Sequence, residues 1–171
     1  MKNITRTKIY LPMAAMILTA AFAIPAAAQT QVPFKGVFQG SDNVAFPTLT
    51  QSITGIGTLV GQFSSTAVFT LPAGTGPAHW IAANGDSIDT TSVGSLEPVI
   101  MSRCQVVGAQ PEDSYNKVTQ IHTITGGTGR FAGVQGSFTV TLYHDVVPRS
   151  DGTHGTCGSF SGTITPPGAA N

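Results

Sequence analysis

The stretch SFTVTLYHD, residues 137–145, decides the fold class of this chain. Its apolar residues Phe138, Val140 and Leu142 occupy every second position, and mostly polar residues stand between them. A period of two places alternate side chains on opposite faces of a β-strand. The stretch therefore predicts a strand with one buried face.

Further short runs, rich in Thr, Val, Ile and Phe and separated by Gly or Pro, continue this pattern along the chain. After Gln29 no apolar spacing of three and four persists over a dozen positions without Gly or Pro, so no long helix is expected. About nine strands are predicted, at Phe34 to Gln39, Leu49 to Phe63, Thr66 to Leu71, His79 to Ala83, Ser87 to Ser92, Pro98 to Val107, Val118 to Ile124, Ser137 to Val147 and Ser159 to Thr165. So many strands in one domain predict an all-β fold, an antiparallel up-and-down β-barrel of about eight strands, with a β-sandwich as the alternative.

Residues 1–28 have the features of a secretory signal peptide. Three basic residues among the first eight precede an apolar run, and three alanines at 26–28 form a small-residue cleavage site. The run is shorter than the ~20 apolar residues that a membrane-spanning helix needs. We therefore expect export to a bacterial periplasm or the medium, one barrel domain over residues 29–165 and a flexible tail over 166–171.

Composition argues against a nucleic-acid partner. Three of the 8 Lys and Arg residues lie in the leader, so 5 basic and 8 acidic side chains remain, a formal charge of −3. Phosphate binding requires clustered Lys and Arg, whereas the remaining cations are scattered. Charged residues make up only 9% of the sequence, so Thr, Ser, Gln and Asn must hydrate the exterior.

The two cysteines, Cys104 and Cys157, are predicted to form a disulfide. An even number of cysteines in an oxidising compartment favours pairing. The bridge would close a loop of 53 residues and stabilise the fold by about 4 kcal/mol in the chain-entropy model. Two buried free thiols on separate strands are the alternative.

A glycine-rich stretch, TITGGTGRFAGVQGS at residues 123–137, leads into the opening strand. Glycine permits positive φ and close backbone approach, so we expect the chain to turn sharply here, with Phe131 packed inward and Arg130 in solvent. The residues assigned to this structural loop are Gly126, Gly127, Gly129, Arg130, Phe131 and Gly133.

Residues 127–132 also satisfy the G-x-G-x-x-A form of the dinucleotide fingerprint. That motif aims a helix N-terminus at a pyrophosphate, whereas a period-two strand follows the loop here. A phosphate-binding P-loop would need Lys-Ser or Lys-Thr after the glycines, and neither is present. We therefore expect no nucleotide and no other cofactor.

The longer stretch ITGGTGRFAGVQGSFTV, residues 124–140, resembles the glycine-rich hairpin of the allene oxide cyclase and dirigent superfamily. It is more similar still to related exported bacterial proteins of unknown function that carry a TGGTGRFAG hairpin. The resemblance implies an eight-stranded antiparallel calycin-type barrel, often oligomeric, with an apolar cavity along its axis. No acidic residue here aligns with the catalytic glutamate of the cyclases, so the resemblance implies a fold and not an activity.

The interior of such a barrel is just wide enough to be filled by side chains or to hold one small ligand. We predict that five apolar residues line it: Phe69, Trp80, Phe138, Val140 and Leu142. Trp80, the only tryptophan, lies mid-strand among small residues. Core packing and ligand stacking are both open to it.

Histidines and Ser161 offer no recognisable catalytic or metal pattern. Four histidines are candidate ligands: His79, His122, His144 and His154. None has a short ligand spacing to another histidine or to a cysteine, so we expect no metal site. His122 and His144 would meet only if their strands pair across the glycine loop. Ser161 lacks the G-x-S-x-G spacing of a nucleophile elbow.

Most acidic residues fall at predicted turns, where solvation accounts for them. Glu97, at the start of the predicted strand 98–107, is the first candidate for burial, because a desolvated carboxyl is poised for acid–base chemistry. The other acids considered are Asp86, Asp89, Glu112, Asp113, Asp145 and Asp151. No catalytic residue is assigned, and a non-enzymatic role is favoured over an enzymatic one.

Three functions follow from these observations. The first is a barrel that binds a small apolar ligand, with a cyclase-like isomerase as a variant. The second is a non-enzymatic surface or assembly module, whose low charge and Thr-rich exterior serve contacts with another protein or with glycan; a homo-oligomer is a further expected partner, as the resemblance implies. The third is a metal-assisted enzyme built on His122 and His144. The volume of the interior cavity separates the first two, because a filled barrel favours the module and a pocket of several hundred Å³ favours the ligand.

Overall fold

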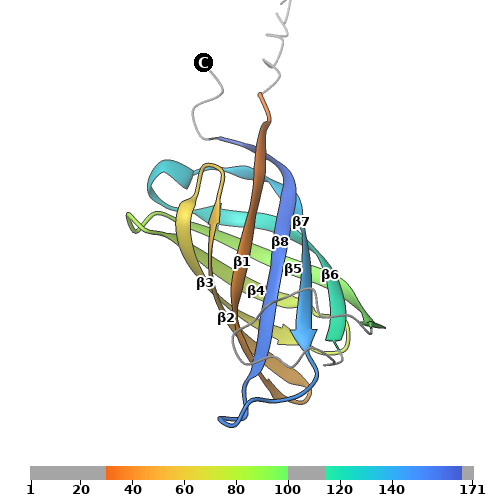
Figure 1. Cartoon of the computed structure of the whole chain (residues 1–171). Coiled ribbons are helices and arrows are strands. Elements are labelled where there is room, and N and C mark those ends of the chain that lie inside the picture. The colour runs from red at the N-terminus through yellow and green to blue at the C-terminus, as the bar shows by residue number, and fades with distance from the viewer. Residues whose placement is uncertain (1–29, 100–114, 167–171) are drawn as a thin grey trace, which may run out of the picture.

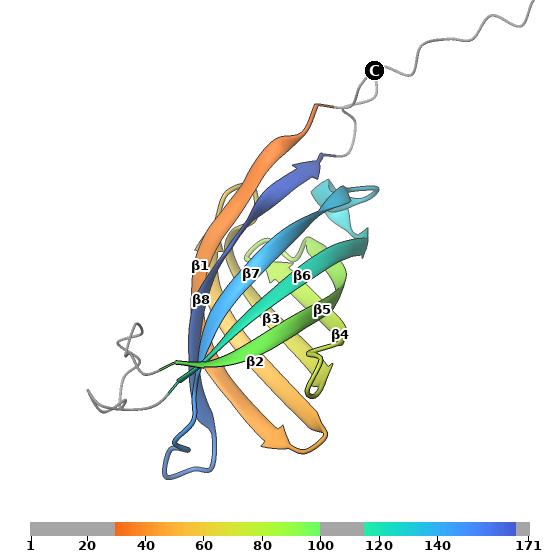
Figure 2. The ribbon, with the colours of Figure 1, turned by 90° about the vertical axis from the view of Figure 1, so that its right-hand side faces the viewer.

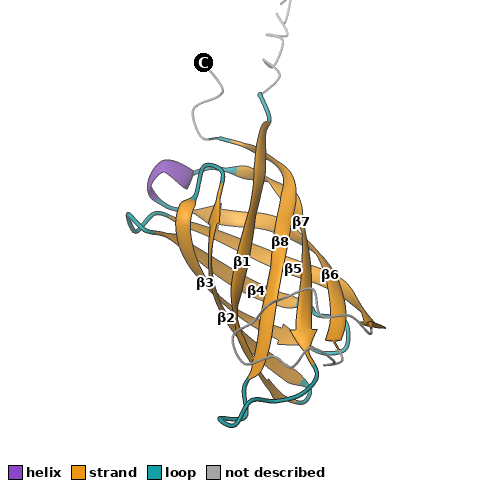
Figure 3. Ribbon diagram, in the orientation of Figure 1, coloured by secondary structure: helices purple, strands orange, loops and turns teal. Residues whose placement is uncertain are grey.

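The computed structural model describes residues 30–99 and 115–166 of the 171-residue chain. These residues form eight β-strands and one short 3-10 helix, η1 (Figure 3). The strands are β1 Val32–Ala45, β2 Thr48–Gly57, β3 Gly61–Thr70, β4 Gly76–Ala82, β5 Ser87–Val99, β6 Tyr115–Gly127, β7 Gln135–Asp145 and β8 His154–Thr165, and η1 is Gly129–Phe131. The all-β prediction is confirmed.

The strands form one closed antiparallel barrel in which each strand pairs with its neighbours in sequence. The circuit is completed by β1 and β8, which lie side by side in both Figure 1 and Figure 2. Their register runs from Val32 opposite Ile164 to Asp42 opposite His154. The up-and-down barrel is confirmed, and the sandwich alternative is excluded because a sandwich would leave this seam open.

Two predicted strands have different boundaries. The run predicted at 49–63 is two strands joined by a tight turn, in which Leu59 adopts a φ of 65°. The segment Ser87–Val99 is one strand, so Pro98 lies within β5 and does not begin a new strand. Most of the strand predicted at 98–107, together with Cys104, Glu112 and Asp113, lies outside the described residues.

Strand alternation separates the interior from the exterior. On β3 the buried residues are Phe63, Ser65, Ala67 and Phe69, and on β7 they include Phe138, Val140 and Leu142. The exterior is mostly Thr, Ser and Gln with isolated valines and isoleucines, such as Val68 at 50% exposure. The alternation predicted for residues 137–145 is confirmed.

Half of the interior is filled by aromatic rings. We call it the aromatic half and define it by Phe34, Phe63, Trp80, Phe138 and Phe160, whose ring centroids lie 4.8–5.8 Å apart in the contacting pairs. Such spacings fall in the range of favourable edge-to-face and tilted ring contacts.

Glycines on neighbouring strands make room for these rings. A Cβ at Gly36 would lie 2.6 Å from Cε1 of Phe160, and one at Gly57 would lie 2.5 Å from its Cζ. No real side chain tolerates these distances, so the Phe160 ring occupies the space that two missing side chains leave. A narrow barrel can bury large rings only where facing positions are small.

The glycine-rich connection between β6 and β7 closes the aromatic half. Its helix η1 lies at one end of the barrel (Figure 3). There Phe131 is buried with Val60 and Val134. The opposite end carries the β1–β2 and β3–β4 connections, at residues 46–47 and 71–75.

Residues 1–29 and 167–171 lie outside the described residues, so the leader, the processing site and the tail stay predictions. Among the residues that the structure describes, no helix has the length and apolarity to cross a membrane.

Candidate functional site

The interior opposite η1 contains a cavity of about 160 Å³. We call this part of the barrel the hollow half. The cavity is bordered by Asp42, Val44, Leu49, Gln51, Phe69, Leu71, Pro72, Gly74, Gly94, Ser95, Leu96, Asn116, Val118, Gln120, Leu142 and His144. They come from β1, β2, β3, β5, β6 and β7 and from the β3–β4 connection, because the inward positions of these six strands near this end face the same cavity.

A buried pair of side chains, Asp42 and His144, lies in the wall of this cavity. Oδ2 of Asp42 accepts a hydrogen bond from Nδ1 of His144 at 2.7 Å. Asp42 is 1% exposed and His144 is 8% exposed. The pair bridges two strands that both border β8, because Asp42 lies opposite His154 and His144 lies opposite Thr156. Burial of a carboxyl group is tolerated when such a partner is present.

A second histidine supports the imidazole of this pair. The ring of His154 stacks on that of His144, with centroids 4.8 Å apart and planes 26° apart. Nδ1 of His154 lies 2.9 Å from the carbonyl oxygen of Asp145, and a carbonyl can only accept, so Nδ1 is the donor. The hydrogen bond to Asp145 fixes the His154 ring, and this ring packs on one face of His144. Asp42 holds the edge of the His144 ring at Nδ1.

Two buried oxygens at the cavity wall have no hydrogen-bond partner among the described residues: Oδ1 of Asp42 and Oε1 of Gln120. Nε2 of Gln120 donates to the carbonyl oxygen of Gly74 at 3.2 Å, which fixes the orientation of the amide and leaves its oxygen unpaired. Ser92 donates to the same carbonyl at 3.0 Å. Burying an unpaired acceptor costs about 1–3 kcal/mol.

Sequence reasoning missed Asp42. The sequence did contain a signal: Asp42 lies four residues after Phe38, which lies four residues after Phe34, so all three share the inward face of β1. Its partner is 102 residues away in the sequence, so no local pattern announces the pair.

The five residues predicted to line the interior are all buried inside the barrel. Phe69 and Leu142 border the cavity. All five belong to the hydrophobic core of buried side chains, and Trp80, Phe138 and Val140 are not among the residues that border the cavity.

His122 lies in the aromatic half and does not meet His144. Its ring stacks on Phe138 with centroids 5.2 Å apart, and its Nδ1 lies 3.0 Å from Oγ1 of Thr90. The register places His122 opposite Phe138 and His144 opposite Asn116, six positions along the same ladder. Burial lowers the pKa of His122 to about 4. Within the described part of the chain, no group of three His, Cys, Asp or Glu side chains could hold a metal ion.

The exterior carries a second His–Asp pair. Nδ1 of His79 on β4 lies 2.5 Å from Oδ1 of Asp89 on β5, and both side chains are nearly half exposed. Water competes for both groups of this exposed pair, so its interaction is screened, whereas the pair formed by Asp42 and His144 is buried.

Glu97, the first candidate for burial, is on the outside of the barrel and is not buried. Its carboxylate is 2.6 Å from Nζ of Lys117 on the neighbouring strand, and its side chain is 60% exposed. The even-numbered residues of β5 face the interior, so Glu97, an odd-numbered residue, faces solvent. Ser161 is likewise exposed.

The glycine-rich loop makes its contacts with the barrel itself. The hydroxyl of Thr128 lies 3.1 Å from the amide nitrogen of Ser87, and Arg130 forms an ion pair with Asp86 at 3.1 Å. Gly129 adopts a φ of 56°. A Cβ at Gly127 would lie 2.5 Å from the carbonyl oxygen of Phe131 and 2.8 Å from that of Ser87, so this position has no room for a side chain.

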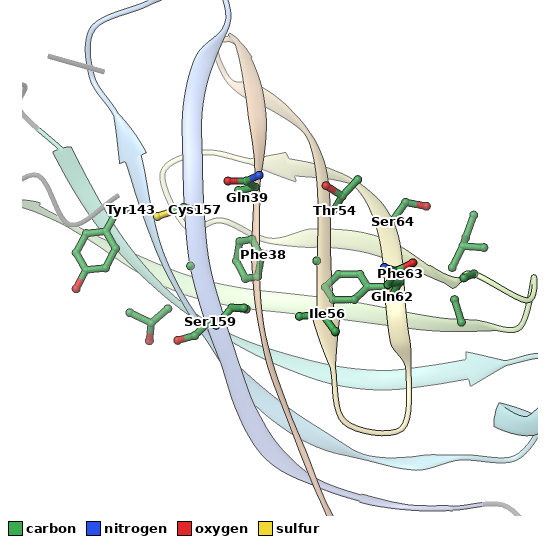
Figure 4. A pocket seen from close by; sticks show the side chains of 17 residues that line it. Phe38, Gln39, Thr54, Ile56, Gln62, Phe63, Ser64, Tyr143, Cys157 and Ser159 are labelled. Carbon is green, nitrogen blue, oxygen red and sulfur yellow. The ribbon is translucent and has the colours of Figure 1, made fainter. Parts of the chain in front are cut away.

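A larger groove of about 1160 Å³ lies on the outside of the barrel, over β1, β2, β3 and β8, and extends to residues of β4 and β7 (Figure 4). Its lining includes exposed Val37 and Ile56, together with Gln39, Thr54 and Ser64. Cys157 also borders it, and the predicted disulfide stays a prediction because Cys104 lies outside the described residues. No Asp, Glu, His, Lys or Arg side chain is among the described residues that line the groove.

Comparisons with known proteins identify no relative. No family model matches the chain, and searches of curated proteins and of solved structures find no significant similarity.

Proposed function

We propose that this chain is an exported β-barrel protein that binds one small, mostly apolar ligand in the cavity of the hollow half. One observation carries the proposal: the same eight strands that fill the aromatic half leave a space of about 160 Å³ at the other end. An apolar cavity of about 150 Å³ in another protein binds benzene, so this cavity suits a ligand of about one ring. Drug-sized sites are larger, about 300–1,000 Å³.

Kinship with the allene oxide cyclase and dirigent superfamily is part of the proposal. Its support is the glycine-rich hairpin at residues 124–140 together with a closed barrel of eight strands. A cyclase-like activity is the less favoured variant. Export rests on the leader and on the low charge of the remaining chain.

A cavity-filling substitution tests the binding site. Val118 is half-buried on β6 and borders the cavity, so Val118→Phe adds a ring to the space that the ligand would occupy. We expect toluene and a small fluorescent apolar probe to bind the mature protein saturably and to lose most of their affinity in Val118→Phe. Ile121→Phe is the matched control, because Ile121 is on the same strand but faces solvent at 53% exposure.

The result that would contradict the proposal is equal binding in all three proteins, or no binding to the wild type. Thermal melts of the three proteins show whether each variant is folded. Equal affinity in a folded Val118→Phe variant would place the probe outside the cavity.

Assembly through the outer groove is the second candidate function. Val37 and Ile56 are 57% and 58% exposed on neighbouring strands, and exposed apolar side chains in a groove favour a protein contact. Light scattering of the wild type and of Ile56→Glu tests it. A dimer or larger species that becomes a monomer in the variant would support assembly, and a monomeric wild type would remove homo-oligomers from this candidate.

A further inference from the structure

The cavity wall combines an apolar surface with two unpaired buried acceptors, Oδ1 of Asp42 and Oε1 of Gln120. Both residues are at least 98% buried, at 1% and 2% exposure. The other oxygen of Asp42, Oδ2, accepts from His144, and Nε2 of Gln120 donates to the carbonyl oxygen of Gly74. No described group donates to either of these two oxygens, so a ligand that brings a donor would satisfy one of them.

From this pattern, and resting on the proposed function, we propose that the cavity selects a small neutral ring compound that bears a hydroxyl group, with the hydroxyl donating to Asp42. A purely apolar ligand would leave both acceptors buried and unpaired, and a ligand with only a carbonyl would add a third acceptor. A carboxylate ligand would place a second negative charge beside Asp42. An ammonium group would be attracted by the Asp42 carboxylate, but it would bring three N–H donors to two unpaired acceptors, and the cost of desolvating a charge whose donors are not all paired outweighs that attraction.

His144 acts here as a positioning residue. Its Nδ1 holds Oδ2 of Asp42 at 2.7 Å, and its own ring is packed against His154. Because one carboxylate oxygen is held, the other is fixed in orientation, and a ligand that donates to it gains a preorganised partner.

The competitor for this site is water. The share of liquid volume taken by one water molecule is about 30 Å³, so a cavity of about 160 Å³ has room for several. A ligand displaces this water with net gain only when it covers the apolar wall and also replaces the hydrogen bond to Asp42.

Three ring compounds of nearly equal size test the selection: cyclohexanol, cyclohexanone and methylcyclohexane, titrated calorimetrically into the mature protein. We expect cyclohexanol to bind about tenfold or more tightly than the other two, since a hydrogen bond to a charged acceptor discriminates by at least that factor. Cyclohexanecarboxylate should not bind detectably, and cyclohexylammonium should bind more weakly than cyclohexanol.

Asp42→Asn should invert the preference. If the amide oxygen of the new side chain accepts from His144, its NH₂ group takes the place of Oδ1, and position 42 then presents a donor to the cavity. We expect cyclohexanone to equal or exceed cyclohexanol in this variant. Asp89→Asn, which alters the exposed His–Asp pair, is the matched control and should keep the wild-type order.

The possible outcomes separate the two proposals. Binding of all three neutral rings with equal affinity would overturn the selection for a donor while retaining the cavity site. Binding of none of them would contradict the proposed ligand-binding function itself. Tighter binding of cyclohexylammonium than of cyclohexanol would show that the cavity recognises a positive charge and would overturn the selection for a neutral ligand. The comparison on the wild-type protein decides between these results even where Asp42→Asn does not fold.

Discussion

The two halves of the barrel interior are built from the same strands but differ in what those strands turn inward. Toward η1, β1 contributes Phe34 and Phe38, whereas toward the other end it contributes Asp42. Strand β7 changes in the same way, from Phe138 to His144. The barrel wall is continuous, so the hollow arises from the choice of inward residues and not from the backbone. An aromatic interior stabilises the fold, while the interior lined by shorter and polar side chains leaves space for a ligand.

The largest expected effect compares two residues on one face of β7. Phe138→Ala removes a ring that contacts Phe34, Trp80, Phe160 and His122, and we expect a loss of about 3–5 kcal/mol in the free energy of unfolding. Leu142→Ala should cost about 2 kcal/mol, because Leu142 already borders empty space and has fewer packing contacts to lose. Urea denaturation measures both. Equal losses in the free energy of unfolding would show that the side chains of the two halves stabilise the fold to the same extent, which contradicts this comparison.

The next effect is a pH dependence that originates in the aromatic half. Burial lowers the pKa of His122 to about 4, whereas the unfolded chain titrates near 6.5. Between these values the unfolded state binds more protons, so stability falls as the pH decreases from 6.5 to 4, by about 3 kcal/mol in total. His122→Phe should flatten this slope. Denaturation curves at pH 7, 5.5 and 4.5 test it, and a slope that persists in the variant would assign the effect to other groups.

A smaller effect concerns the loop that closes the aromatic half. Gly129 and Gly133 both adopt positive φ, at 56° and 80°. A Cβ at Gly133 meets nothing within 4 Å, whereas one at Gly129 would overlap the carboxylate of Asp86. We expect Gly133→Ala to cost about 1 kcal/mol from backbone strain alone and Gly129→Ala to cost about 2 kcal/mol. Similar melting temperatures in the two variants would show that Asp86 moves aside freely.

The smallest expected effect is that of Arg130→Ala. The side chain is 49% exposed, and it pairs with Asp86 and donates to the carbonyl of Val60 at 3.2 Å. An exposed ion pair of this kind contributes about 0–1 kcal/mol, so the melting temperature should change little. Ligand binding in the hollow half should not change. Reduced binding with an unchanged melting temperature would give the glycine-rich loop a functional role.

Local periodicity explains why much of the fold could be predicted. The alternation from Phe138 to Leu142 depends on neighbours two residues apart, and the sequence displays it directly. Alternation fails as a guide at β5, where outward Val93 is 55% exposed and inward Leu96 borders the cavity mouth at 46%. Because apolar residues lie on both faces, the sequence of this strand does not show which side faces inward, and it left Glu97 as a candidate for burial.

The candidate site could not be predicted for a different reason. Asp42 and His144 meet because β8 lies between their strands in a particular register. That register is a property of the closed barrel, and a shift by one residue would turn Asp42 outward. The neighbours of Asp42 in the sequence, Ser41 and Asn43, are polar and suggest a turn as readily as a strand.

The seam between β1 and β8 sets the order in which this chain can fold. Val32 pairs with Ile164, so the barrel closes only after nearly the whole described chain has emerged. Contacts between residues so distant in sequence form slowly, on a scale of milliseconds to seconds. Until His154–Thr165 docks, β1 and β7 are open edges that can pair with other chains. The last twelve residues of the barrel therefore have a large effect on aggregation, because their docking closes the barrel and removes both open edges.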